Sequence, residues 1–424
     1  MAILILGANG FIGSAVLARL ERAGHELVGL GRDITAAKHR FPSVRWHRAD
    51  LAGLNTPADW TPYLDGIDVV VNCAGALQDG QRDDVTATQR DAMLALYAAA
   101  RQAGLRLLVQ ISARTDGAGE LPFLATKAEA DRALAASGLN HVILRPALVL
   151  GRNAHGGSAL LRALAALPIV TPLVFADRRV ETVSVEDGAD CVRMAIDGSL
   201  PPGTDLYLAG DALDLSRLVA LHRTWLGLPP AKTLALPDAV AGPVSRMADL
   251  AGRLGWRSPL RSTAMQVMAG GITAGGSRLD LPLQTAGETL ARNPAGVQDL
   301  WFARLYLLKP VLVVTLALFW ILSGLVPFSD LARAAAHFSP FMPQNAALGL
   351  TVATALLDIT LGVLLLWRPT ARMALVGQAA LALAYLAGGT LLAPALWLDP
   401  LGPYVKVLPA LALIPPTLAV LDER

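Results

Sequence analysis

The sequence predicts an α/β doubly wound parallel sheet followed by an all-α bundle of four transmembrane helices. Over residues 1–220, short β-like runs alternate with Ala- and Leu-rich stretches in which apolar residues recur at helical spacing. From about residue 306 onward, long apolar runs with almost no charged residues follow one another. The alternation is typical of a parallel sheet with helices on both faces, and apolar runs of about 20 residues are long enough to cross a bilayer.

The composition agrees with this division and limits the function. Hydrophobic residues make up 54% of the chain and charged residues 17%, and the mean hydropathy is +0.46. Soluble proteins are less apolar, so we expect part of the chain to lie in lipid. The net charge of +2 indicates no nucleic-acid partner. Cys73 and Cys191 match no metal or disulfide pattern, so we expect reduced, buried, structural cysteines and no metal site.

Six strands are predicted in the first part of the chain, separated by helical segments that each stop at a glycine. In chain order they are AILILG, HELVGLG, VRWHRAD, DVVVNCAG, RLLVQIS and HVILRPALVLG. The N-terminus has no basic region or cleavage site and leads directly into a glycine motif. It therefore predicts a strand rather than a signal peptide, and a cytosolic N-terminal part. Residues 221–305 are rich in Pro and Gly and predict a smaller lobe with a linker.

Four apolar segments predict a transmembrane domain over residues 306–424. They are residues 310–328, 345–367, 373–398 and 407–421, of which the last is shorter and holds three prolines. Asp358 lies near the middle of the second segment, where a carboxyl group is expected to face the interior of the bundle. It is either a proton-relay or quinone-site residue, or a protonated side chain hydrogen-bonded to a neighbouring helix through Gln378 or Thr351. The segments contain no histidine and no cysteine cluster, which argues against haem and iron–sulfur centres.

The charged residues beside these segments predict the orientation. If four helices span the membrane and the head is cytosolic, five basic residues lie inside and two lie outside. The inside residues are Arg304, Lys309, Arg368, Arg372 and Arg424, and the outside residues are Arg333 and Lys406. This excess agrees with the positive-inside rule.

The stretch ILILGANGFIGSAVLARL predicts a strand, a glycine-rich turn and a helix that together bind a dinucleotide. Gly7 permits the tight turn, Gly10 lets the backbone approach a pyrophosphate, and Gly13 lets the helix pack against the strand. The helix N-terminus offers free N–H groups and a partial positive charge to the phosphates. The residues expected at the cofactor in this turn are Gly7, Asn9, Gly10, Phe11, Ile12 and Gly13.

Three further strand ends predict cofactor contacts. The second strand ends in GLGRD, and Arg32 can accept the 2′-phosphate of NADP, so NADP(H) is favoured over NAD(H). Asp50 and Leu51 follow the third strand and could meet the adenine, while Ala74 and Gly75 in NCAGAL (72–77) leave room for the cofactor. Each of these two segments is equally consistent with an ordinary turn.

The motifs GANGFIG, ADL, NCAG, ISA, FxxxK and LRPALVLG occur in this order, and together they resemble a short-chain dehydrogenase/reductase of the atypical or extended kind. The resemblance covers roughly the first 220 residues and implies a Rossmann-type fold. LLVQISA followed by TKAEAD looks most similar to the branch that contains the Rossmann-type accessory subunit of respiratory complex I. The stretch from DLWFARLYLLKP onward is similar to a four-helix membrane domain called DoxX-like. The fusion implies a multi-pass protein of the bacterial inner membrane.

Enzymes of this family use a serine, a tyrosine and a lysine, and the resemblance assigns the serine to Ser112 and the lysine to Lys127. Lys127 is also expected to bind the nicotinamide ribose. Phe123 stands at the tyrosine position, and a phenyl ring has no proton to give. Hydride transfer could use Ser112, Thr126 or water instead, or a substrate that needs no strong acid, such as a quinone.

Two classes of function therefore stay open. The first is a membrane-associated oxidoreductase that acts on a quinone, a lipid carbonyl or an isoprenoid. The second is a non-catalytic accessory or assembly protein of a membrane complex, in which the nucleotide stabilises the head. Tyr207, which we expect in the second lobe, is the remaining candidate for a catalytic tyrosine.

Overall fold

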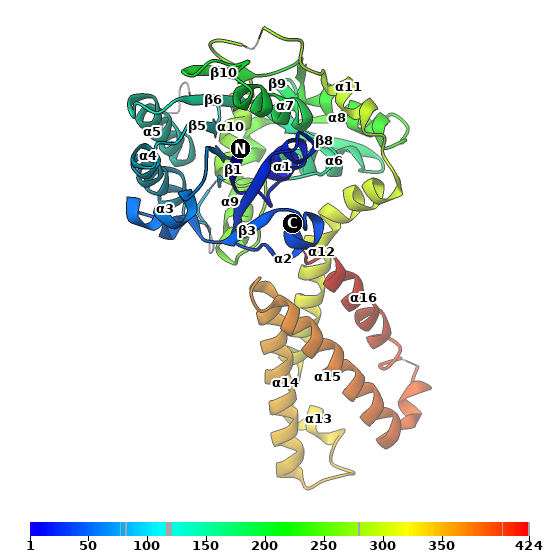
Figure 1. Cartoon of the computed structure of the whole chain (residues 1–424). Coiled ribbons are helices and arrows are strands. Elements are labelled where there is room, and N and C mark those ends of the chain that lie inside the picture. The colour runs from blue at the N-terminus through cyan, green and yellow to red at the C-terminus, as the bar shows by residue number, and fades with distance from the viewer. Residues whose placement is uncertain (77, 81–82, 116–120, 279, 401, 423–424) are drawn as a thin grey trace. The chain divides into compact units, whose positions relative to one another are not determined.

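The computed structural model describes residues 1–76, 78–80, 83–115, 121–278, 280–400 and 402–422. Leu77 of the NCAGAL segment and Arg424 of the predicted inside flank lie outside these ranges. The chain divides into two compact units (Figure 1). The first holds Met1–Asp249 and Ser258–Ala303, and the second holds Leu250–Arg257 and Arg304–Arg424. Most of the predicted lobe at 221–305 thus belongs to the unit that contains the large sheet.

The first unit is built on a seven-stranded parallel sheet, which confirms the predicted α/β class. The strand order is β10-β6-β5-β4-β1-β2-β3, so the order reverses on either side of β1. The strands are β1 (Ala2–Leu6), β2 (Glu26–Gly31), β3 (Arg45–Arg48), β4 (Val69–Asn72), β5 (Leu107–Ile111), β6 (His141–Pro146) and β10 (Thr204–Leu208). All six predicted strands form, and β10 is a seventh that the sequence patterns did not indicate.

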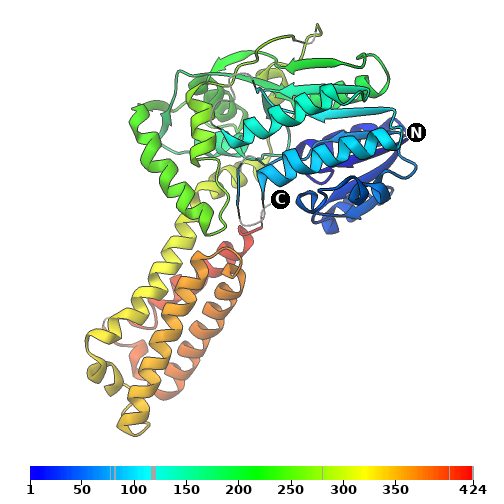
Figure 2. The same ribbon diagram turned by 90° about the vertical axis from the view of Figure 1, so that its left-hand side faces the viewer.

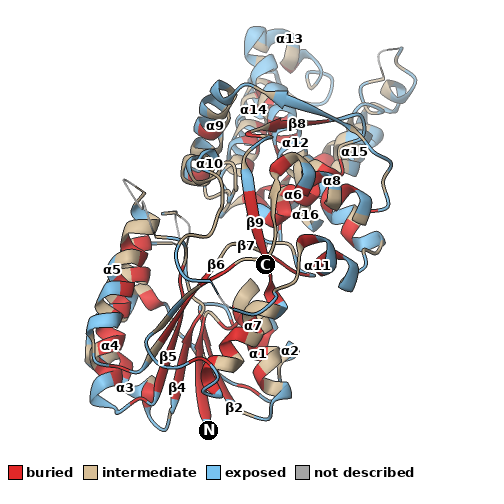
Figure 3. Ribbon diagram, turned by 90° about the horizontal axis from the view of Figure 1, so that it is seen from above, coloured by how far each residue is buried: buried red, intermediate tan, exposed pale blue. Residues whose placement is uncertain are grey.

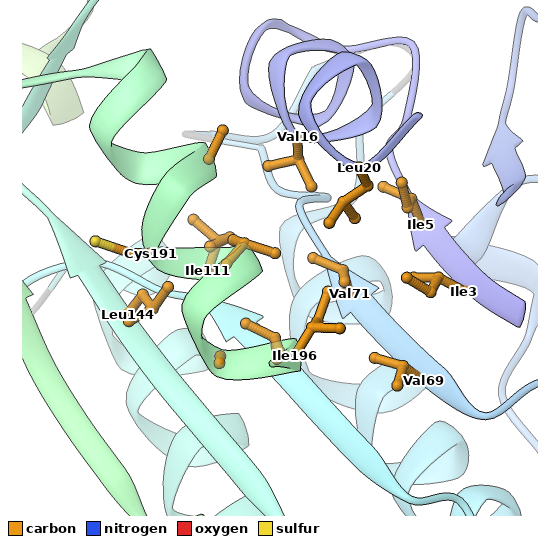
Figure 4. Packing of buried hydrophobic residues seen from close by; sticks show 14 of the residues in the cluster. Ile3, Ile5, Val16, Leu20, Val69, Val71, Ile111, Leu144, Cys191 and Ile196 are labelled. Atoms are coloured by element: carbon orange, nitrogen blue, oxygen red, sulfur yellow. The ribbon is translucent and has the colours of Figure 1, made fainter. Parts of the chain in front are cut away.

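Helices cover both faces of this sheet. Successive residues of β1 point to opposite sides, so this one strand contributes to a hydrophobic cluster on each face. Ile3 and Ile5 pack in one cluster with Val16 and Leu20 of α1 (Phe11–Arg22) and with α7 (Val185–Ile196), as Figure 4 shows. Leu4 and Leu6 pack in a second cluster against the helices of the other face. Those helices are α3 (Pro57–Leu64), α4 (Ala92–Gln102) and α5 (Pro122–Ala136). Burial on both faces explains why the strands are continuously apolar, and Figure 3 shows β4 and β5 as buried.

The predicted strand HVILRPALVLG is in fact two strands. β6 ends at Pro146, which has no N–H to donate, and β7 (Leu148–Leu150) then joins a separate three-stranded sheet. In that sheet β7 pairs with β9 (Arg179–Ser184), which also pairs with β11 (Ala212–Asp214), while β8 (Val170–Val174) pairs with β12 (Lys232–Leu236). The helices around these strands are α6 (Gly157–Ala165), α8 (Leu215–Trp225), α10 (Ser262–Ala269) and α11 (Ala286–Arg292). Shorter or peripheral elements are α2 (Thr35–Arg40), the 3-10 turns η1 (Leu51–Gly53) and η3 (Asp238–Val240), the π-helical turn η2 (Ala87–Asp91), and α9 (Ala241–Arg253).

The second unit is helical, and within the described ranges three of its helices are long and apolar enough to cross a membrane. They are α12 (Val297–Leu325, continued to Ser329 by the 3-10 turn η4, Val326–Ser329), α14 (Gln344–Leu366) and α15 (Ala371–Leu392). Short helices α13 (Leu331–Ala336) and η5 (Pro394–Trp397) follow α12 and α15, respectively. Figure 2 shows α14 and α15, in orange, running side by side. Small residues permit such contacts: a Cβ added at Gly324 of α12 would lie 2.3 Å from the carbonyl oxygen of Ala355 of α14.

The predicted fourth apolar segment forms a helix that is shorter than the other three. The segment forms α16 (Val407–Ala419), whose 13 residues rise only about 20 Å, against a hydrocarbon core of about 30 Å. The apolar run is too short for a full crossing by this helix alone. The orientation of the head was predicted on the assumption of four spans, so its cytosolic position stays a prediction.

The segment Leu250–Arg257 is attached to the second unit through Trp256. The indole N–H donates to the carbonyl oxygen of Leu366, the last residue of α14, at 2.7 Å. The backbone N–H of Arg368 donates to the carbonyl oxygen of Leu254 at 2.9 Å, and the Lys309 ammonium lies 5.7 Å from the Trp256 ring centroid. A tryptophan with basic neighbours at the end of an apolar helix is typical of the membrane–water boundary.

Candidate nucleotide-binding and active site

The glycine turn after β1 has a shape that side chains would disrupt. Gly7 has a φ of 66°, and Gly10 donates its N–H to the Gly7 carbonyl at 2.9 Å. A Cβ at Gly13 would lie 2.2 Å from the Gly7 oxygen, and a Cβ at Gly7 would lie 3.0 Å from the Ala74 Cα at the end of β4. The turn therefore packs closely on two sides, which explains why Gly7 and Gly13 are glycines.

The N-terminus of α1 fits a phosphate group. Its N-cap residue is Gly10, and no side chain caps the helix or places a negative charge in its first turn. The free N–H groups and the helix dipole at this end favour an anion. Phe11 and Ile12 open the helix and are partly buried, and the Phe11 ring stacks on His155 at 6.3 Å between centroids. The predicted loop residues thus surround a cradle that suits the pyrophosphate of a dinucleotide.

The end of β2 lies beside this turn. The Asn9 side chain donates to the carbonyl oxygen of Asp33 at 2.6 Å, and a Cβ at Gly31 would lie 2.5 Å from the Asn9 Oδ1. Asn9 therefore fixes the glycine turn to the segment that carries Arg32. The Arg32 guanidinium forms an ion pair with Asp83 at 2.7 Å, and its side chain is 46% exposed. A 2′-phosphate at this place would have to compete with the Asp83 carboxylate.

The remaining predicted cofactor residues lie at the same edge of the sheet. The Asp50 carboxylate accepts the N–H of Ala52 at 3.2 Å and so caps η1. Leu51 is buried in the hydrophobic cluster that contains Trp60. The Ala74 N–H donates to the Asn72 side chain at 3.0 Å. Asp50 and Leu51 therefore have structural roles of their own, whether or not they also contact an adenine.

Lys127 is buried at the carboxyl end of β5. Its ammonium donates to the carbonyl oxygen of Ile111 at 3.2 Å, and a Cβ added at Gly75 would lie 3.6 Å from its Nζ. Burial lowers the pKa of Lys127, and the nearby Asp131 carboxylate opposes that shift. The structure thus brings together Lys127 from α5 and Gly75 from the segment after β4, as the site prediction requires.

Ser112 belongs to a buried polar network that the sequence patterns did not reveal. Its hydroxyl donates to the Asp131 Oδ2 at 2.6 Å, and the Arg145 Nη1 donates to the same oxygen at 2.8 Å. Arg145 also forms two hydrogen bonds to the Asp205 carboxylate, at 2.7 and 2.8 Å. Burial raises the pKa of Asp131, while Arg145 opposes the rise.

A signal for this network was present in the sequence. Asp131 follows Lys127 by four residues, a spacing that places both on one face of a helix, and Arg145 stands in the predicted strand LRPALVLG. Asp205 could not be anticipated, because β10 was not predicted. The network joins β5, α5, β6 and β10 whether or not Ser112 takes part in catalysis.

The groups that could replace the missing tyrosine are held elsewhere. Phe123 lies in the first turn of α5, and the Thr126 hydroxyl donates back to the Pro122 carbonyl at 3.0 Å. Tyr207 lies on β10 of the main sheet and not in a second lobe, which corrects the prediction. The Arg145 guanidinium lies 5.9 Å from the centroid of its ring. The Thr126 hydroxyl is thus engaged with the backbone of α5, and the Tyr207 ring packs beside Arg145.

The cysteines differ in exposure. Cys191 is buried, as predicted, but Cys73 at the end of β4 is only partly buried. Burial raises the pKa of each thiol to about 12, so neither is a thiolate at neutral pH. Over the described ranges of the chain, no three His, Cys, Asp or Glu side chains gather as metal ligands.

Two family matches agree with this geometry. Residues 3–206 match the NAD dependent epimerase/dehydratase family, and residues 317–415 match the DoxX-like family. The uncharacterized protein Rv2047c of Mycobacterium tuberculosis is 29% identical over 225 residues, which cover 52% of this chain and 23% of that protein. The uncharacterized protein YLL056C of Saccharomyces cerevisiae is 44% identical over 70 residues, 16% of this chain and 24% of that protein. The chain thus spans about a quarter of the length of the curated relatives it matches.

Solved structures show the same fold. The crystal structure of gox2253 has a TM-score of 0.53 at 20% identity and covers 72% of this chain and 99% of its own. The UDP-glucuronic acid 4-epimerase from Bacillus cereus, in complex with NAD, has a TM-score of 0.50 at 16% identity and covers 72% and 97%, respectively.

The N-terminal part is therefore an NAD(P)-binding Rossmann domain of the epimerase and short-chain dehydrogenase/reductase type. The C-terminal part is a DoxX-like membrane domain. The closer similarity to the complex I accessory subunit stays a prediction.

Proposed function

We propose that this protein is a membrane-anchored oxidoreductase that binds NADP(H) and acts on a hydrophobic substrate of the quinone or lipid-carbonyl type. We place it in the bacterial inner membrane with its Rossmann head in the cytosol. The observation that supports catalysis best is the buried Lys127 ammonium, held by the Ile111 carbonyl and adjacent to Gly75. A buried ammonium is costly unless its charge and its N–H donors have partners. The Asp131 carboxylate offsets part of the charge, and the hydroxyls of a nicotinamide ribose would accept hydrogen bonds from the ammonium.

In this proposal, different residues of the head bind the cofactor and the substrate. The turn Gly7–Gly13 and the N-terminus of α1 would hold the pyrophosphate, and Lys127 the ribose. The nicotinamide supplies or accepts the hydride. Ser112 would accept a hydrogen bond from the hydroxyl of the reduced substrate, because its own proton is directed to Asp131. Phe123 gives no proton, so water protonates the product. A quinone suits this site because its reduced form needs no strong acid.

The preference for NADP(H) rests on Arg32, which follows β2 at the position where a 2′-phosphate is bound. Its ion pair with Asp83 sets the strength of that preference, since the pair must open before the phosphate can bind. The DoxX-like domain supports the choice of a lipid-soluble substrate, because it keeps the enzyme where such compounds dissolve.

The experiment uses the full chain in detergent, with NADPH, a short-chain quinone and the cofactor absorbance as readout. Lys127→Ala should lower kcat/KM roughly 10- to 100-fold, because a hydrogen bond to a charged group contributes about 1.5–3 kcal/mol. Phe123→Tyr should raise the rate with substrates that need an acid. Lys232→Ala removes an exposed lysine and serves as the control with unchanged turnover.

A non-catalytic role is the second candidate, favoured by Phe123 and by the commitment of the Ser112 hydroxyl to Asp131. In this role the protein is an accessory or assembly subunit of a respiratory-type membrane complex. Tight NADPH binding without turnover on quinones, lipid carbonyls and a nucleotide sugar would exclude the enzyme. Proteins of one complex that co-purify with the chain would then support the accessory role.

A further inference from the structure

The DoxX-like unit contains a cavity with a few polar groups among its apolar helices. The cavity has a volume of about 50 Å³, and residues of α12, α14, α15 and α16 line it. Most of the lining is apolar, but Trp320, Ser323, Asp358 and Tyr385 contribute polar groups. Three of the four helices that meet here are long enough to span a membrane. Polar groups in such a setting usually mark a functional site.

Asp358 is the centre of this polar group and is only 5% exposed. The Tyr385 hydroxyl donates to its Oδ1 at 3.0 Å, and the Ser323 hydroxyl donates to its Oδ2 at 3.2 Å. The partners predicted from the sequence form other hydrogen bonds. Gln378 donates to the carbonyl oxygen of Leu361 at 3.2 Å, and Thr351 donates to the carbonyl oxygen of Ala347 at 2.8 Å. Three helices thus converge on one carboxyl group through side chains that the linear sequence keeps far apart.

Trp320 supplies an independent sign that this cavity receives a ligand. The residue is 3% exposed and lines the cavity, and its indole N–H has no hydrogen-bond partner among the described residues. A buried donor without an acceptor destabilises the protein, because the N–H has lost its water and gained no partner. The site therefore offers a hydrogen-bond donor from Trp320 and a hydrogen-bond acceptor from Asp358, whose two oxygens each have a further lone pair.

The size of the cavity restricts the occupant. A benzene ring occupies a cavity of about 150 Å³, so a volume of about 50 Å³ holds one edge of a ring and not the whole ring. Phe319 also lines the cavity and is 37% exposed, so this lining residue lies between the cavity and the surface of the unit. The remainder of a lipid-soluble molecule could extend from there into the bilayer.

We propose that this cavity binds the oxygen-bearing edge of a quinone-type ring. A ring carbonyl would accept the Trp320 N–H, and the hydroxyl of the reduced form would donate to Asp358. Phe319 provides an aromatic surface beside the ring. The proposal rests on the proposed function, which names a lipid-soluble substrate, and it adds a binding site for that substrate in the DoxX-like unit.

The test is calorimetric binding of a short-chain ubiquinone to the full chain in detergent, without cofactor. Trp320→Phe and Asp358→Asn should each weaken binding about tenfold, the upper effect of one lost hydrogen bond of about 0.5–1.5 kcal/mol. Trp301→Phe changes a tryptophan of α12 that is 60% exposed, and it should change affinity less than twofold. Ser323→Ala is a milder variant should Asp358→Asn fail to fold, and it should weaken binding about threefold.

Equal affinity in wild type, Trp320→Phe and Ser323→Ala would overturn the proposal and leave water as the occupant of the cavity. The same holds if the wild-type chain binds no quinone at all. The test separates this inference from the proposed function. Loss of quinone binding in Trp320→Phe without any NADPH oxidation by the wild type would support the site and refute the enzyme. Quinone-dependent oxidation that is unchanged in Trp320→Phe would do the reverse.

Discussion

Replacing Gly10 with alanine should weaken cofactor binding and leave the fold intact. A Cβ at Gly10 would have one neighbour within 4 Å, the Gly7 carbonyl oxygen at 3.1 Å, which a small shift can accommodate. The methyl group would nevertheless stand at the N-cap of α1, where a phosphate must approach the helix amides. A hydrogen bond to a charged group contributes about 1.5–3 kcal/mol, so the loss of one such bond weakens binding roughly 10- to 100-fold.

Gly13 offers a contrasting variant from the same turn. A Cβ there would lie 2.2 Å from the Gly7 oxygen and 2.8 Å from the Gly7 carbonyl carbon, so the backbone itself must move. Overpacking of this kind costs about 1–3 kcal/mol, which the gain of about 1 kcal/mol in helix propensity offsets only in part. Gly13→Ala should therefore lose both affinity and thermal stability, whereas Gly10→Ala should lose affinity alone.

The assay is calorimetric titration of the full chain in detergent with NADPH, alongside thermal unfolding of each variant. Gly242→Ala in α9 is the control, because its Cβ would meet nothing within 4 Å. That variant should bind NADPH like the wild type. The interpretation of the glycine turn is refuted if Gly10→Ala binds NADPH with unchanged affinity, or if it unfolds as early as Gly13→Ala.

Two further predictions concern the head. Asp131→Asn should lower the free energy of unfolding by about 3 kcal/mol. This is the low end of the range for a broken buried ion pair, because Arg145 keeps its ion pair with Asp205. Asp205→Asn should lower it by about 1 kcal/mol, because Asp205 is partly exposed. Thermal unfolding of the head measures both, and equal shifts would contradict the structural role of Asp131. Arg32→Ala should lower the ratio of NADPH to NADH affinity about tenfold, while Asp83→Asn should raise it by removing the competing carboxylate. Calorimetry with both cofactors decides this, and a ratio that neither variant changes would remove the basis for NADP(H).

The fold was largely predictable because its local signals agree with one another. Most of the predicted strands of the Rossmann sheet are apolar runs buried on both faces, with the edge strand β3 as the exception, and the glycine triplet stands at the first strand–helix junction. β10 was missed because TDLYL is short and because it becomes a strand through its pairing with β6, which is distant in the sequence. The division at Pro146 was missed for a similar reason, since the pattern of apolar residues continues across the proline while the hydrogen bonding does not.

The candidate site was predictable only where it depends on one segment. The turn from Gly7 to Gly13 forms from consecutive residues, so the motif contains all of its geometry. The partner of Ser112 comes from α5, and the partners of Asp358 come from α12 and α15. Such pairings depend on how helices pack, and no spacing in a single sequence encodes them.

The polar network bears on which of two residues, Ser112 or Lys127, is the better evidence for catalysis. Ser112, Asp131 and Arg145 would be needed to hold β5, α5 and β6 together even in a protein with no activity, so the presence of Ser112 does not favour an enzyme. Lys127 is different, because within the described part of the chain its ammonium donates one hydrogen bond, to the Ile111 carbonyl, and the nearby Asp131 carboxylate offsets only part of the cost of its burial. An apolar side chain of similar length would fill that space at lower cost than a buried ammonium. The charge is therefore best explained by a ligand at the carboxyl edge of the sheet, and the case for an oxidoreductase depends on Lys127 more than on Ser112.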